Sequence, residues 1–244
     1  MNAPHLRRVE LGAGWNPPNS ISIPWPQLTH LTLVAPPFAG VAVLAKCSNL
    51  VSADLSEMYT FGLDDTALTT ATLTHLTSLS LTISSALIQA VGNLDLPALT
   101  TLSFNYRRTG MIWPHLAVFH QLPLHTIQYL SFELNNDPTL ELTTLYALLR
   151  CTPNVISLRL KSTCISNALV SALRTDVPPS DVLLPRLEAF WMEWATLGDY
   201  FDLENLKAML SSRVGLGLLM YPKSSDDLYN TFKSAVAAIR SAIP

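Results

Sequence analysis

The sequence predicts an α/β fold in which short parallel strands line one face of the chain and helices cover the other. Three observations support this prediction: an apolar hexapeptide pattern recurs along the chain, the spacing of apolar residues becomes helical between the copies, and charged residues are scarce. Apolar residues make up 49% of the chain and charged residues 14%, whereas an ordinary soluble domain carries about 25% charged residues. Such a composition favours a fold whose core recurs along its whole length.

The recurring pattern is L-x-x-L-x-L with apolar substitutions, and eight copies are clear. Their first positions lie 22 to 32 residues apart, and most of the intervals fall within the roughly 20–29 residues of leucine-rich repeats. The copies are Leu6-x-x-Val9-x-Leu11, Leu28-x-x-Leu31-x-Leu33, Leu50-x-x-Ala53-x-Leu55, Leu76-x-x-Leu79-x-Leu81, Leu99-x-x-Leu102-x-Phe104, Ile127-x-x-Leu130-x-Phe132, Val155-x-x-Leu158-x-Leu160 and Leu187-x-x-Phe190-x-Met192. The sequence therefore predicts an α/β leucine-rich-repeat solenoid, a horseshoe with a parallel β-sheet on the concave face and helices on the convex face.

Each copy is expected to form one short strand whose side chains alternate between two faces. Positions 4 and 6 then face the core together with position 1, and positions 3, 5 and 7 face the concave wall. One repeat buries about three aliphatic side chains, at ~1.5–3 kcal/mol each. Ordering its ~25 residues costs about 1–2 kcal/mol per residue in backbone entropy. A single repeat cannot fold alone, so stability must come from stacking one repeat on the next.

Between the strands, apolar residues spaced at i, i+3, i+4 and i+7 predict helices. The clearest helical set is Ile165, Ala168, Leu169, Ala172 and Leu173. Residues 142–149 follow the same pattern, and residues 203–210 follow it more loosely. The earlier segments 38–47 and 84–91 are shorter and are expected to form single turns.

The chain is expected to form one domain, with residues 1–223 as the solenoid of about eight to nine repeats and residues 224–244 as a C-terminal capping helix. A ninth, degenerate copy is expected around Leu216–Tyr221. Ser224-Ser225-Asp226-Asp227 resembles a capping box that opens the last helix. The longest interval between copies contains Asp176–Asp181, whose prolines predict a surface loop insertion. Only five residues precede the first copy, so we expect either an upstream continuation or a frayed first repeat that something else covers.

Two segments share a pattern in which a helix ends in cysteine, Pro-Asn or Ser-Asn follows, and a strand comes next: Cys151-Thr152-Pro153-Asn154-Val155 and Cys47-Ser48-Asn49-Leu50. This pattern resembles the leucine-rich repeats of fungal F-box proteins, which form horseshoes like ribonuclease inhibitor. The strands at Trp25–Leu33 and Leu96–Leu102 are also similar to those of that family. The resemblance implies that the repeats select a target for a cullin-type ubiquitin ligase. The F-box that docks to the ligase normally precedes the repeats, and this chain has no room for it, so ligase subunits are expected partners only if an upstream F-box exists.

Composition also argues against several classes of function. A net charge of −3 and a pI near 6.0 argue against binding to nucleic acid, which needs clustered lysine and arginine. The longest weakly polar run, Val34–Ala45, is interrupted by prolines and is shorter than the ~20 residues of a membrane-spanning helix. Three cysteines without a C-x-x-C spacing, and no secretion signal, favour a reducing compartment. We therefore expect an intracellular protein, cytoplasmic or nuclear, that does not act at a membrane.

Sequence motifs for catalysis are absent as well. The six histidines form no H-E-x-x-H and no i, i+4 pair suited to a metal, and the chain has no G-x-S-x-G, Walker or G-x-G-x-x-G motif. A cysteine–histidine nucleophile pair is not favoured by any spacing. We therefore expect no catalytic residues, no cofactor and no metal site, and the sequence does not predict an enzyme.

The candidate binding site is the C-terminal third of the concave wall, where large and charged side chains gather. Aromatic residues and arginine are the types that dominate binding energy at protein interfaces. The site is predicted to consist of Tyr129, Ser131, Glu133, Arg159, Lys161, Trp191 and Glu193. The alternative is that Trp191 folds against Trp194 or Tyr200 and that the charges only solvate the face.

These observations together predict a protein-binding module, by resemblance the substrate-recognition part of an F-box-type ubiquitin ligase adaptor. Two alternatives stay open. The chain could be a horseshoe protein that inhibits or activates an enzyme, or a truncated product of the F-box family without ligase docking.

Overall fold

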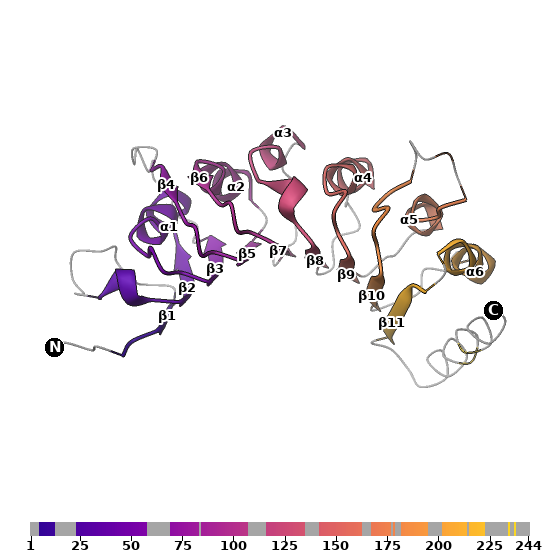
Figure 1. Ribbon diagram of the computed structural model, residues 1–244, viewed down its shortest axis with the longest axis horizontal. Helices are drawn as coiled ribbons and strands as arrows, with labels where there is room; N and C mark the ends of the chain where they lie inside the picture. The colour runs from indigo at the N-terminus through magenta and orange to yellow at the C-terminus, as the bar shows by residue number, and fades with distance from the viewer. Residues whose placement is uncertain are drawn as a thin grey trace. The chain divides into compact units, whose positions relative to one another are not determined.

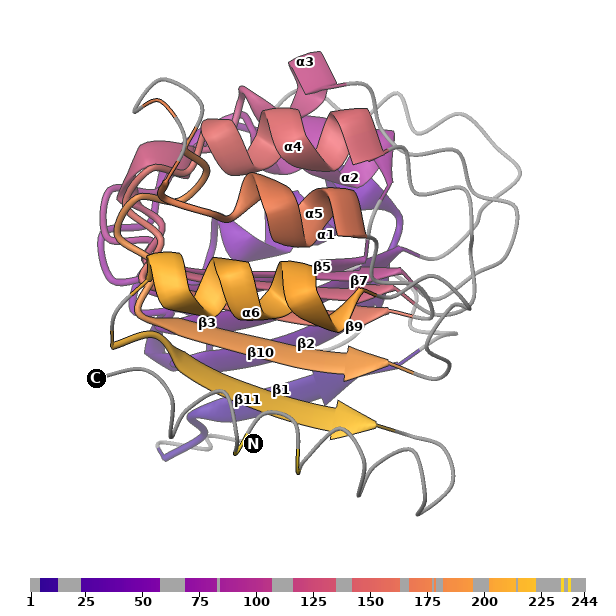
Figure 2. The same ribbon diagram turned by 90° about the vertical axis from the view of Figure 1, so that its right-hand side faces the viewer.

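The structure is a computed structural model, and it describes residues 5–12, 23–57, 69–82, 84–106, 116–134, 142–162, 167–176, 178, 182–194, 202–213, 215–222, 234 and 237. The chain divides into two compact units, residues 1–106 with 111–127 and residues 107–110 with 128–244. In each unit parallel strands lie side by side, and the described helices cover one face of them (Figures 1 and 2). The predicted α/β class with a parallel sheet is therefore confirmed.

The first unit contains five parallel strands of its main sheet in the order β1-β2-β3-β5-β7. These strands are β1 (Arg8–Leu11), β2 (His30–Ala35), β3 (Ser52–Glu57), β5 (Ser78–Thr82) and β7 (Thr101–Tyr106). The helices of this unit are η1 (Trp25–Gln27), α1 (Pro37–Leu44), α2 (Ser85–Val91), α3 (Leu116–Phe119) and η2 (Leu124–Thr126). Two further short strands, β4 (Ala71–Thr72) and β6 (Leu94–Asp95), pair with each other in parallel. They lie on the helix side of the main sheet (Figure 1).

The second unit contains four parallel strands in the order β8-β9-β10-β11. They are β8 (Tyr129–Leu134), β9 (Ser157–Ser162), β10 (Ala189–Trp194) and β11 (Gly217–Pro222). Three helices, α4 (Leu142–Arg150), α5 (Asn167–Ala172) and α6 (Leu203–Ser212), connect them. Figure 2 shows these three helices side by side on one face of the strands. The opposite face of the strands, which no described helix covers, is called the open face below.

The core follows the repeat as the sequence predicts. Positions 1, 4 and 6 of the second to eighth copies are all buried, with exposed fractions from 0% to 6%. The strand register aligns each of these positions with its counterpart in the next copy, for example Leu31 with Ala53 and Leu33 with Leu55. Phe104 also packs edge-on against Phe119, with ring centroids 5.4 Å apart. The expected alternation of inward and outward side chains is therefore confirmed for these copies.

At six of the described strands, one backbone carbonyl just before the strand holds the following copy in register. The carbonyl of Arg7 accepts hydrogen bonds from the amides of Thr29 and His30, at 2.9 and 3.0 Å. The same arrangement repeats at Thr29, Val51 and Thr77 in the first unit and at Gln128 and Ile156 in the second. Because each such carbonyl receives two successive amides of the next copy, a shift by one residue would break both bonds and turn the buried side chains outward.

Threonine side chains add to this ladder in the first unit. The hydroxyl of Thr29 donates to the carbonyl of Arg7, at 3.2 Å, and that of Thr77 donates to Val51, also at 3.2 Å. The hydroxyl of Thr126 donates to the carbonyl of Leu99 at 2.6 Å. At Thr29 and Thr77, each directly before a strand, the backbone amide and the hydroxyl both bond to the preceding copy.

The helices agree with the predicted periodicity, with one correction. Helices α4, α5 and α6 form where the apolar spacing predicts them. Segments 38–47 and 84–91 were expected to be single turns, but α1 and α2 contain eight and seven residues. The side chain of Ser84 accepts a hydrogen bond from the amide of Leu87 at 3.0 Å and so caps α2. With this cap, α2 is longer than its apolar spacing alone suggests.

The C-terminal expectations have mixed outcomes. The degenerate ninth copy forms β11, which pairs with β10 in register, so this prediction is confirmed. Of residues 224–244, predicted to form the capping helix, only Ser234 and Ala237 are described. The rest of this prediction lies outside the described residues. The single-domain prediction for 1–223 stays a prediction.

A buried arginine, Arg213, links the residues on both sides of the predicted loop insertion. Asp176 and Pro178 of the insertion are exposed, and its other residues up to Asp181 lie outside the described residues. Arg213, only 7% exposed, donates through its guanidinium to the carbonyl oxygens of Leu173, Leu183 and Leu184. Leu184 has a φ of 50°, a left-handed conformation that costs a leucine roughly 1–2 kcal/mol. Burial lowers the pKa of Arg213, although arginine ordinarily titrates so high that it stays charged at neutral pH.

Replacing Arg213 with Met is expected to lower the free energy of unfolding by about 2–4 kcal/mol, because the buried carbonyl oxygens of the insertion lose their donor. The matched control is Arg174→Met, since among the described residues the Arg174 side chain pairs only with the exposed Asp176 and surface pairs contribute little. Urea unfolding should show a lower midpoint for R213M and an unchanged midpoint for R174M. Equal midpoints for the two variants would contradict this role of Arg213.

Candidate functional site

The seven predicted site residues all lie on strands β8, β9 and β10 of the second unit. The strand register places them in rows across the sheet: Tyr129 with Ser157 and Ala189, Ser131 with Arg159 and Trp191, and Glu133 with Lys161 and Glu193. None of the seven side chains is among the buried residues of the core. The structure therefore brings the predicted residues together on the open face of three adjacent strands.

The charged residues of the site pair with one another. The Lys161 ammonium donates to Glu133 Oε1 at 2.7 Å and lies 3.7 Å from Glu193 Oε1. Arg159 Nη2 lies 3.6 Å from Glu193 Oε2. Glu133, Lys161, Glu193 and Arg159 therefore form a continuous series of ion pairs, the charge chain, whose two acids and two bases make it neutral. Opposite charges facing each other on neighbouring strands contribute roughly 0.2–1 kcal/mol per pair, so the chain orders the open face more than it stabilises the fold.

Lys161 is the centre of this chain. The hydrogen bond to Glu133, followed by the negative charges of Glu133 and Glu193, raises the pKa of Lys161 above its usual value, while partial burial and Arg159 oppose the shift. Because the lysine pKa is raised, Lys161 contributes its full share of this stabilisation below pH 10.5 wherever the two carboxylates are ionised, and that share is lost as the pH rises through the folded-state pKa of Lys161. The chain of charges is therefore intact at neutral pH.

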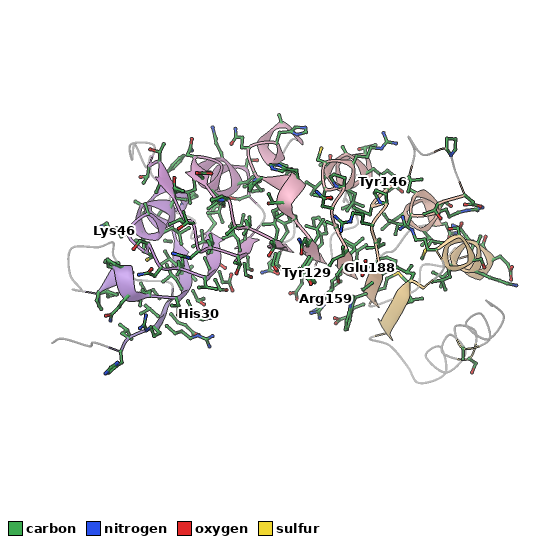
Figure 3. The ribbon with its side chains drawn as sticks, viewed as in Figure 1. His30, Lys46, Tyr129, Tyr146, Arg159 and Glu188 are labelled. Atoms are coloured by element: carbon green, nitrogen blue, oxygen red, sulfur yellow. The ribbon has the colours of Figure 1, made fainter. Side chains whose placement is uncertain are left out.

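The non-polar part of the site is aromatic. Tyr129 is 47% exposed and is one of two large apolar side chains classed as exposed among the described residues; the other is Val51. Trp191 is half-buried and lies directly across from Arg159 in the strand register. In Figure 3, Tyr129 and Arg159 lie on the open face, whereas Tyr146 lies with the helices. An aromatic surface and an exposed guanidinium thus share one face.

The alternative role for Trp191 concerns residues that are only partly described. The side chain of Trp194 and the whole of Tyr200 lie outside the described residues. The charges of the face form a connected series of ion pairs, and the alternative that they only solvate the face stays open.

The open face also includes small residues that the predicted site left out. Ser157, Ala189 and Gly217 follow Tyr129 in one row across β9, β10 and β11. Ser157 and Ala189 are half-buried and Gly217 is exposed. The sequence already gives Tyr129, Ser157 and Ala189 as third positions of successive copies, and the structure adds Gly217 of β11 to the row.

The open face of the first unit has a different chemistry. Serine, threonine and asparagine side chains bond to each other across its strands: Thr82 Oγ1 donates to Ser56 Oγ at 3.1 Å, and Asn105 Nδ2 donates to Ser80 Oγ at 2.9 Å. Because these polar groups bond to one another, fewer of their donors are available to a partner. Among the described residues, this face also has no cluster of exposed aromatic side chains. It is a weaker candidate for binding.

The described residues contain no cluster of three or more histidine, cysteine or acidic side chains that could hold a metal ion. The thiol of Cys47 is fully buried and donates to the carbonyl of Val43 at 3.4 Å. Burial raises the pKa of Cys47 from 9.0 to about 12, with a smaller opposing effect of Lys46. At neutral pH this group is a protonated thiol, which is a poor nucleophile.

Comparison with known proteins does not assign a family. No family model matches the chain, and a search of the curated proteins also finds no match. Among the described residues, no helix is long and apolar enough to cross a membrane.

Cys47 is expected to resist alkylation in the folded protein. In a Cys151→Ser/Cys164→Ser variant, where Cys47 is the remaining thiol, iodoacetamide should react slowly at pH 8 without denaturant and rapidly in urea, because only the thiolate attacks. The stability that the neutral thiol provides should be complete below pH 9 and should decline as the pH rises toward 12. Equal reaction rates in the folded and unfolded variant, measured by mass spectrometry, would contradict this burial.

Proposed function

We propose that this chain is a non-catalytic leucine-rich-repeat horseshoe that binds another protein through the open face of its second unit. The observation that carries the proposal is the convergence of Tyr129, Arg159 and Trp191 on adjacent strands. Tyrosine, tryptophan and arginine are the residues on which protein–protein binding energy most often depends. The repeated burial of positions 1, 4 and 6 supports the solenoid part of the proposal.

The charge chain supports a protein partner more than a nucleic acid. Its two acids balance its two bases, so these four residues present no net positive charge to a phosphate backbone. Binding would instead rest on the apolar area of Tyr129 and Trp191. Arg159 has a side chain that is 59% exposed, and its ion pair with a described residue is the 3.6 Å contact with Glu193, so within this part of the chain most of its five N–H donors are available.

The resemblance of the repeats to those of fungal F-box proteins suggests what the binding is for. On that basis we propose that the chain recognises a target for a cullin-type ubiquitin ligase inside the cell, in the cytoplasm or nucleus. Docking to the ligase would require an F-box, and the resemblance covers only the repeats. Target recognition is therefore the part of this proposal that the described residues can support.

The binding proposal predicts that Tyr129→Ala, Arg159→Ala and Trp191→Ala each weaken binding to the target by about tenfold or more, as loss of a central aromatic or arginine residue does at other interfaces. The target would first be captured with a photo-reactive amino acid at position 129 and identified by mass spectrometry. Affinities would then be measured by calorimetry with the purified target.

The matched control is Lys207→Ala on α6, an exposed residue on the helix side of the unit, which should bind like the wild type. Thermal melting followed by circular dichroism would show whether W191A, the half-buried position, still folds; Y129A and R159A test the same face at exposed positions. Unchanged affinity in both Y129A and R159A would refute the binding site.

Ligase subunits in the captured complex would support the adaptor role, and a single enzyme partner would support the alternative of an enzyme-regulating horseshoe.

A further inference from the structure

Strand β1 lies at the edge of the first unit. It is the first strand in the order of the sheet and pairs with β2 on one side. An edge strand presents a row of backbone amides and carbonyls to whatever lies beside it, and such a row can pair with another chain. The side chains of this strand determine which partner fits.

The core side of β1 is incompletely covered. Val9 and Leu11 are in register with Leu31 and Leu33, which are 2% and 1% exposed. Val9 and Leu11 themselves are half-buried. Because they occupy core positions of the repeat, a further strand beside β1 would bury apolar surface that is now partly in contact with water.

The backbone phase of β1 limits how another strand can pair with it. The carbonyl of Arg7 points toward β2, since it accepts hydrogen bonds from Thr29 and His30. Backbone groups of successive residues in a strand point to alternate sides. Arg8 and Glu10 therefore direct their amides and carbonyls away from β2, toward the side of β1 on which no described strand pairs.

The side chains of Arg8 and Glu10 are exposed on the open face, and within the described part of the chain neither takes part in an ion pair. If a second copy of β1 pairs antiparallel at this edge, its outward residues must face Arg8 and Glu10. Only three symmetric registers satisfy this requirement. Arg8 opposite Arg8 and Glu10 opposite Glu10 bring like charges together, which is destabilising across strands. Arg8 opposite Glu10 of the second copy brings opposite charges together twice.

We propose that β1 is a homodimerisation edge, at which two copies of this chain pair antiparallel about a two-fold axis through Val9. In this register Arg8 of each copy faces Glu10 of the other in a hydrogen-bonded pair, and the two Val9 side chains meet on the core side in the closer, non-hydrogen-bonded pair. The two-fold axis makes the interface self-complementary, as closed dimers require. The edge is only four residues long, so the association is weak and concentration-dependent.

Sedimentation equilibrium tests the proposal with the full chain. Wild-type protein should move from its chain mass of 26.8 kDa toward twice that mass as its concentration is raised to about 1 mM, the dissociation constant of a very weak complex. Arg8→Glu and Glu10→Arg should each weaken self-association on the order of tenfold, because each creates two like-charge pairs. The double variant R8E/E10R should regain the wild-type behaviour.

A mixture of the two single variants is the decisive sample. R8E carries two acids on β1 and E10R carries two bases, so each should associate with the other but not with itself. Circular dichroism establishes that the variants are folded. The proposal is overturned if the wild type stays monomeric at all concentrations, if the single variants associate like the wild type, or if neither the double variant nor the mixture restores association.

Discussion

The structure depends on the burial of three side chains from each short strand. No single copy can offset its backbone entropy with so little apolar area, so each copy is stable only against its neighbours. The carbonyl that receives two amides from the following copy enforces the same register at each step, from Arg7 to Thr77 in the first unit and from Gln128 to Ile156 in the second. Burial supplies the energy, and this hydrogen-bond pair selects one alignment.

The open face inherits its order from that alignment. Side chains that point away from the core have no packing to position them, yet they stand in rows because the core residues beside them do. Glu133, Lys161 and Glu193 are in line for this reason, and their alternating charges then fix each other. A binding surface built this way can change its side chains without disturbing the fold, since the two sets of positions are separate.

Departures from the repeat occur where another interaction replaces it. The long insertion before β10 interrupts the regular spacing, and Arg213 reconnects it by donating to carbonyls on both sides of the loop. Leu184 keeps its left-handed backbone there while its side chain stays buried. At β1 the opposite situation holds, because Val9 and Leu11 follow the pattern but pack against a neighbouring described strand on one side only, β2. The first departure stabilises the second unit, and the second leaves a strand edge that no described strand pairs with.

Most of the strand arrangement and the membership of the candidate site followed from the sequence. A period-two pattern determines which residues face the core, so the rows containing Tyr129, Arg159 and Trp191 could be written down before any coordinates. Apolar spacing did not give the lengths of α1 and α2. In α2 the Ser84 side chain caps the first turn through a local backbone geometry that apolar spacing does not encode, whereas α1 begins at Pro37 without a side-chain cap. It also did not reveal that Arg213 is buried, since an arginine near a helix end ordinarily lies in solvent. The pairing within the charge chain was likewise decided by the tertiary structure, because ion pairs depend on the rotamers of long side chains as well as on strand register. Periodicity is a property of the chain alone, whereas burial of a charge and the choice of its partner depend on segments that are far apart in sequence.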